Sequence, residues 1–140
     1  MKYTEEEDVF REMAQETPYF IYIADLAAFV KMLHSKEGQE KNLENAMANI
    51  WEKGELLNIY FIAGFNWDKR MEVFDNIAFK AYCSHETGIH MGGNADAQRL
   101  FQFPGMPVRE QSKSEKLCTG YVISDDGRMT WKIVTPLERG

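Results

Sequence analysis

The chain has 140 residues, of which 44% are apolar and 27% charged, and its net charge is −6 at pH 7. These values predict one soluble domain with a buried core, and they exclude a disordered tail. They also exclude a membrane protein, because no apolar run reaches the roughly 18 residues of a spanning helix. The negative charge disfavours nucleic acid as a direct partner, and two distant cysteines without a secretion signal indicate reduced thiols in the cytoplasm.

The first predicted elements are a helix, a strand and a second helix. Thr4 and Glu7 form a capping-box pattern ahead of an apolar stripe, and Pro18 ends this first helix. Residues 19–23 form an unbroken apolar run, which predicts a strand covered on both faces, as in a parallel sheet. Apolar residues at helical spacing over 26–33 predict the helix that follows.

Asp25 stands where the predicted strand ends and the next helix begins. Open α/β sheets hold their ligands at the carboxyl ends of the strands, so this carboxylate is a candidate ligand for a metal ion or a water molecule. A helix cap is the other interpretation, because an Asp at a helix start accepts hydrogen bonds from free N–H groups and meets the positive end of the dipole. The stretch alone favours the cap and leaves both interpretations open.

Further along the chain, helices and strands continue to alternate. We expect a loop over 34–38, a helix over 43–51 and a strand over 56–63. A helix over 75–82 follows, and its inward-facing residues would be Phe74, Ile77, Ala78 and Ala81. After it we expect a strand over 87–91 and a helix that Asn94 caps. A turn-rich loop over 103–107 precedes a β-hairpin, whose strands 118–124 and 128–135 flank Asp125-Asp126-Gly127.

This alternation predicts an α/β fold, with a mostly parallel sheet flanked by helices and a C-terminal β-hairpin, in a single domain of residues 1–140. Right-handed crossovers would bring the strand-end loops Ala24–Asp25, Gly64–Trp67 and Gly92–Asn94 to one edge of that sheet. We expect any site to lie at this edge.

Two patterns that could carry chemistry are weak in this chain. The phosphate-binding pattern Gly-x-x-x-x-Gly-Lys-Ser/Thr is absent, and Gly92-Gly93-Asn94 lacks both its lysine and its glycine spacing. Residues 83–90 hold a cysteine, two histidines and a glutamate, but their spacing matches no zinc site, and in a strand His85 and His90 would face opposite sides. We therefore expect no metal ligands.

Several segments, taken in order, resemble the RecA-like ATPase modules of the FtsK/SpoIIIE superfamily. The likeness is closest to the C-terminal module of the EssC/EccC-type ATPases of type VII secretion. The segments are 19–29 (YFIYIADLAAF), 52–66 (EKGELLNIYFIAGFN), 87–94 (TGIHMGGN), 98–101 (QRLF) and the hairpin after Gly120. They cover most of the chain, and their order carries the resemblance more than any single motif does.

The resemblance implies a partial RecA-like fold in which residues 20–25 form a Walker B strand. In such strands an Asp helps to hold Mg²⁺ and the next acid orients the attacking water. Here Ala24 replaces the first acid, and Asp25 takes the place of the second. Asn66 corresponds to the polar sensor after the next strand, and Arg99 to a basic residue at a subunit boundary or near the nucleotide.

The family's phosphate-binding loop lies upstream of its Walker B strand, so the resemblance implies that this chain is either the C-terminal part of a longer ATPase module or a truncated, free-standing relative. It would then bind ATP and Mg²⁺ only when another polypeptide supplies the missing half, and would not hydrolyse ATP by itself. The sheet edge left open by that missing half also makes self-association a candidate behaviour.

The resemblance implies a degenerate ATPase module in the cytoplasmic part of a membrane-associated type VII secretion machine. Its partners would be the signal peptide of a secreted substrate or other ATPase modules. One alternative is a nucleotide hydrolase half-site that another polypeptide completes, and the other is a fragment of a DNA translocase.

Overall fold

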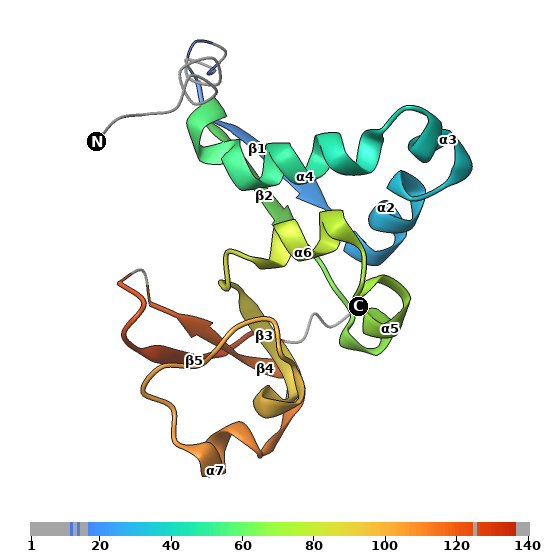
Figure 1. Cartoon of the computed structure of the whole chain (residues 1–140). Helices are drawn as coiled ribbons and strands as arrows, with labels where there is room; N and C mark the ends of the chain where they lie inside the picture. Colours follow the sequence, from blue (N-terminus) through green and yellow to red (C-terminus); the bar gives the residue numbers. More distant parts are fainter. Residues whose placement is uncertain (1–11, 13, 15–16, 125, 137–140) are drawn as a thin grey trace. The chain divides into compact units, whose positions relative to one another are not determined.

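The computed structural model describes residues 12, 14, 17–124 and 126–136, with the element order shown in Figure 1. The protein is mixed α/β and divides into two compact units, unit 1 (Met1–Ser84) and unit 2 (His85–Gly140). The helix predicted before Pro18 lies, apart from residues 12 and 14, outside the described residues. Over the ranges that are described, no helix is long and apolar enough to cross a membrane.

Unit 1 is built on a two-stranded parallel sheet. The predicted strands form β1 (Tyr19–Ile23) and β2 (Ile59–Ala63), which pair from Tyr19 opposite Ile59 to Ile23 opposite Ala63. The second strand begins later than predicted because Gly54–Leu57 forms a 3₁₀ helix, η1, which ends at Asn58 in the left-handed region with φ 56°.

Short helices connect and cover these strands. They are α2 (Leu26–Leu33), α3 (Lys36–Glu40), α4 (Leu43–Lys53), the 3₁₀ helix η2 (Trp67–Lys69), α5 (Arg70–Val73) and α6 (Ile77–Cys83). The predicted loop over 34–38 is wrong in part, since the Ser35 side chain accepts the Gly38 N–H and starts α3. The helix predicted over 75–82 starts at Ile77, because Asn76 accepts the Phe79 N–H.

The core of unit 1 lies where α2, α4 and α6 meet. Trp51 on α4 is 3% exposed and packs against the rings of Phe29, Phe61 and Tyr82. Figure 1 shows α4 running across β1 and β2, in agreement with the edge-on contact between Trp51 and Phe61. Two inward positions predicted for α6, Phe74 and Ile77, are exposed instead.

The prediction that β1 is covered on both faces is wrong within the described part of the chain. Side chains on one face of the sheet remain open to solvent: Phe20 and Tyr22 are each 70% exposed, Ile62 is 60% exposed and Tyr60 is 40% exposed. An apolar run is typical of a strand in a sheet with helices on both faces. The helices described here cover only the face that carries Ile23 and Phe61.

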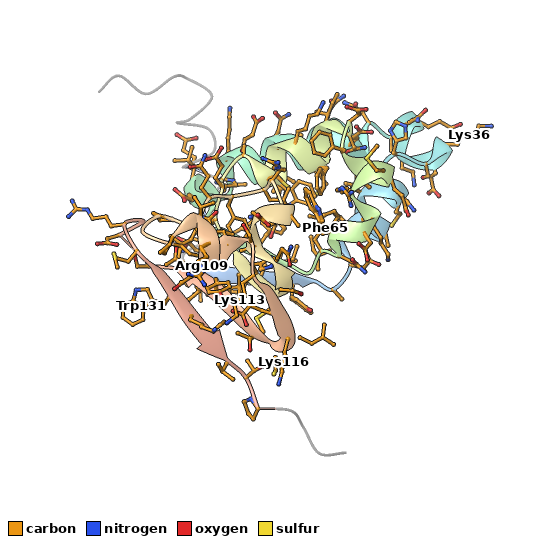
Figure 2. All side chains as sticks on the ribbon, turned by 90° about the horizontal axis from the view of Figure 1, so that it is seen from below. Lys36, Phe65, Arg109, Lys113, Lys116 and Trp131 are labelled. Atoms are coloured by element: carbon orange, nitrogen blue, oxygen red, sulfur yellow. The ribbon has the colours of Figure 1, made fainter. Side chains whose placement is uncertain are left out.

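Unit 2 is a three-stranded antiparallel sheet of β3 (Ile89–Asn94), β4 (Ser114–Ile123) and β5 (Thr130–Val134), in that order. The predicted hairpin between β4 and β5 is confirmed, with Gly127 at φ 68° in its turn. One face of the sheet packs Tyr121 against Phe103, Met106 and Ala95. Trp131 on β5 is 64% exposed, and in Figure 2 it projects away from the ribbon.

Two predictions for unit 2 are wrong. The strand after Thr87 does not join the parallel sheet but pairs antiparallel with β4. Gly92 and Gly93 adopt positive φ, and a bulge between Met91 and Gly93 lets the strand continue to Asn94. The helix that Asn94 was predicted to cap is only the 3₁₀ turn η3 (Ala95–Ala97). Beyond it, the buried Gln98 side chain bonds the backbone of Leu100 and Phe101 in a loop.

Candidate functional site

The carboxyl ends of β1 and β2 meet at one edge of unit 1. Gly64 N–H donates to the Ile23 carbonyl and Leu26 N–H donates to the Gly64 carbonyl, each at 2.9 Å. A Cβ at position 64 would lie 2.6 Å from the Ala24 carbonyl oxygen, so only glycine lets the two loops approach this closely. Two of the three predicted strand-end loops therefore share an edge, while Gly92–Asn94 lies within β3 of unit 2.

Asp25 acts as the N-cap of α2 at this edge. Its Oδ1 accepts the Ala28 N–H at 3.0 Å, and its Oδ2 accepts a hydrogen bond from Lys69 Nζ at 2.6 Å. These two interactions, that with Lys69 first, lower the pKa of the Asp25 carboxyl. Both carboxylate oxygens are occupied and the proton affinity of the group is reduced, so Asp25 is poorly suited to act as a general base.

Asn66 and its neighbours form the loop that places Lys69 against Asp25. The Asn66 side chain accepts the Asp68 N–H at 3.0 Å and caps η2. Arg70 donates to the Trp67 carbonyl at 3.1 Å, and its guanidinium lies 5.2 Å from the centre of the Trp67 ring. Asn66 thus lies at the predicted edge, where its side-chain oxygen accepts a hydrogen bond from the backbone of its own loop.

Arg99 belongs to unit 2. It lines a cavity of about 360 Å³ together with Glu86, Asp96 and Phe101. The structure therefore assigns Asp25 and Asn66 to one unit and Arg99 to the other.

Lys69 is the residue of this edge that the sequence reasoning missed. It lies 44 positions from Asp25, too far for any local pattern to link the two. A signal was nevertheless present, since the loop Gly64–Trp67 was expected beside Asp25 and the basic pair Lys69 and Arg70 follows it closely in the sequence. A search of that loop for a cation opposite the lone carboxylate would have found it.

An apolar groove runs along β1 on the side of the helices. Its volume is about 430 Å³, and its lining is almost entirely apolar: Ile21, Ile23 and Phe61 from the sheet, Phe29 from α2, and Met47 and Ile50 from α4. Such a groove suits apolar side chains and offers no charged group to a phosphate.

The cysteine, the two histidines and the glutamate of residues 83–90 do not come together as metal ligands. Throughout the described ranges, no three His, Cys, Asp or Glu side chains come together as ligands. Burial raises the pKa of the Cys83 thiol to about 11, so this group is protonated at neutral pH and is a weak nucleophile.

Fold and site together define a mixed α/β protein with a neutralised carboxylate at a strand end and an apolar groove beside the first strand. No protein-family model matches the sequence, and neither a curated protein nor a solved structure gives a match.

Proposed function

We propose that this chain is a non-hydrolysing, ATPase-like binding module of the FtsK/SpoIIIE type, which holds a segment of a partner polypeptide in a type VII secretion machine. The observation that carries the proposal is the apolar groove beside β1. Grooves of this kind accept the apolar face of a short helix or the alternate side chains of an extended peptide.

The state of Asp25 supports a binding function over catalysis. A hydrolytic site at this strand end would need one acid for Mg²⁺ and a second to orient water. Ala24 supplies no carboxylate, and Asp25 is engaged by Lys69 and by the start of α2. In this proposal β1 corresponds to a Walker B strand that has lost its chemistry, and the Asp25 side chain stabilises the fold.

Peptide binding tests the proposal directly. Fluorescently labelled signal peptides from partner export substrates, titrated with the full chain, should bind with saturation, and Met47→Lys should weaken that binding at least tenfold by placing a charge in the groove. Leu117→Lys is the matched control, because Leu117 is 86% exposed and belongs to unit 2. Absence of binding together with robust ATP hydrolysis would refute the proposal.

A hydrolase half-site is the second candidate, because Asp25 and Asn66 follow adjacent parallel strands, as a catalytic acid and a sensor would. This function requires another polypeptide to supply the phosphate-binding loop. Ala24→Asp should then raise ATP turnover in the presence of that polypeptide, and an unchanged rate would count against a half-site.

A further inference from the structure

The outer edge of β1 is open within the described part of the chain, since β1 pairs there only with β2. Tyr19 N–H donates to the Asn58 carbonyl at 3.0 Å, and the Ile23 carbonyl accepts from Gly64 N–H. Backbone groups of a strand point to alternate sides, so Tyr19, Ile21 and Ile23 bond to β2. The N–H and C=O groups of Phe20 and Tyr22 therefore point outward.

This edge lacks the devices that usually protect an exposed strand. Natural edge strands carry charged residues, inward-pointing charges or a proline, which prevent pairing with another chain. From Tyr19 to Ala24 the sequence is YFIYIA, without a charge or a proline. The groove beside β1, with Ile21 on its wall, adds apolar surface along the same edge.

We propose that β1 is a self-association site, at which two copies of this chain pair their β1 strands antiparallel about a two-fold axis at Ile21. In this register Phe20 lies opposite Tyr22 of the second copy, so each outward N–H and C=O of these two residues finds a partner. Ile21 meets Ile21 of the second copy as the closer, non-hydrogen-bonded pair. The two parallel sheets become one four-stranded sheet.

Other symmetric registers leave more of the residues of β1 without a suitable partner. Centring the axis on Phe20 sets Tyr22 against Pro18 of the second copy, and Pro18 has no N–H to donate. Centring it on Tyr22 leaves Tyr19 opposite Asp25, whose carboxylate is bonded to Lys69. The axis at Ile21 pairs the whole strand, Tyr19 through Ile23, with itself.

The area available makes this a weak and reversible dimer. The exposed fractions of Tyr19, Phe20, Ile21 and Tyr22 are 56%, 70%, 41% and 70%. If a large side chain contributes about 200 Å² and all of its exposed surface were covered, two copies would bury at most about 950 Å² in total. Stable complexes bury roughly 1,200–2,000 Å², and weaker, transient ones lie below that range.

Electrostatics oppose the pairing at low salt. Residues 1–84 contain nine Lys or Arg and fifteen Asp or Glu, so unit 1 carries the net charge of the chain. Two such units repel each other, and added salt screens that repulsion. The dimer should therefore strengthen as ionic strength rises, whereas an association held by surface ion pairs would weaken.

Sedimentation equilibrium of the full chain, from about 10 μM to about 1 mM, tests the proposal, because weak homodimers dissociate across this range. The register is tested by two matched double variants. Phe20→Lys with Tyr22→Lys places like charges opposite each other and should raise the dimer Kd at least tenfold. Phe20→Lys with Tyr22→Glu sets Lys against Glu of the second copy and should stay within about threefold of the parent Kd.

A cysteine at the axis provides an independent measurement. In a background with Cys83 and Cys118 replaced by Ala, Ile21→Cys should form a covalent dimer under mild oxidation. Ile62→Cys on β2 is the control and should stay monomeric, because its strand is separated from the axis by β1. Circular dichroism and thermal melting confirm that each variant folds. A monomer across the concentration range, or equal Kd values for the two double variants without the Ile21→Cys cross-link, would overturn the proposal.

Discussion

At the scale of single residues, Asp25 shows how an acid at the end of a strand can have a structural use. Its sequence position fitted two interpretations, a cap and a ligand. The cap is confirmed by the hydrogen bond from Ala28 N–H, and the ion pair with Lys69 occupies the other oxygen. A carboxylate held in this way joins the start of α2 to the loop after β2.

The first prediction concerns the pH dependence of this ion pair. In the folded protein Asp25 should titrate below its ordinary pKa, and Lys69→Met should move that pKa upward, because the side-chain hydrogen bond from Lys69 is the largest cause of the lowering. A lowered folded pKa means that the stabilisation is present above the unfolded pKa, near 3.9, and is lost as the pH falls through the folded value.

Carboxyl ¹³C chemical shifts measured between about pH 2 and pH 7 would follow Asp25 directly through its ordinary pKa range. Urea unfolding should separate the parent protein from Lys69→Met at pH 7, and the difference should shrink below about pH 4. Lys41→Met is the control, since Lys41 pairs with the exposed Glu37 on the helix surface. An Asp25 pKa that Lys69→Met leaves unchanged would contradict the prediction.

At the scale of elements, the parallel pair β1 and β2 has one covered and one open face. Phe79 on α6 is 2% exposed, whereas Phe20 on the open face is 70% exposed and stacks on Tyr60 with ring centres 5.4 Å apart. The same residue type therefore occupies two different environments in unit 1. The sequence pattern predicted burial on both faces of β1, but within this strand only Ile23, at its carboxyl end, is buried.

The second prediction compares these two phenylalanines. Phe79→Ala should lower the free energy of unfolding by about 3–5 kcal/mol, because it leaves a cavity in the core. Phe20→Ala should cost about 0.2–1 kcal/mol, the size of a cross-strand side-chain pair. Urea unfolding at low protein concentration measures both without a contribution from self-association. A cost for Phe20→Ala that equals that for Phe79→Ala would mean that the face is covered.

At the scale of the whole molecule, the described chain consists of two units with separate sheets. The parallel sheet of unit 1 and the antiparallel sheet of unit 2 share no strand. The segment between α6 and β3 contains Glu86, which is exposed and adopts φ 49°, in the left-handed region. Exposed connecting segments of this kind are preferred sites of proteolysis.

The third prediction is that limited digestion with a Glu-specific protease cuts the chain after Glu86 earlier than within the described helices of unit 1. Two fragments, residues 1–86 and 87–140, should accumulate before smaller ones, as mass spectrometry can show. Glu86→Gln should remove this cut, while Glu52→Gln within α4 serves as the control and should leave it in place. Early cleavage inside α4 would contradict the division into two units.

Much of the local structure followed from the sequence. The strands β1 and β2, the helices α2 and α4 and the C-terminal hairpin were predicted, because each depends on neighbouring residues: apolar runs, helical spacing and the turn at Asp126 and Gly127. The cap at Asp25 was one of two local interpretations. The short helices α3 and α5 were missed, since four or five residues carry too little periodicity to stand out.

Tertiary structure decided what depends on residues far apart in the chain. The run 87–91 was predicted to lie in the parallel sheet, and its long-range pairing with β4 places it in the antiparallel one instead. The contact between Lys69 and Asp25 spans 44 positions, and the exposure of Phe20 depends on which helices cover the sheet. By itself the sequence determined where most helices and strands begin and end, because residue propensity and helix capping act within a few residues. Long-range packing decided which sheet faces are buried, because the same apolar run suits a covered face and an open one equally well. It also decided which charged side chains form ion pairs.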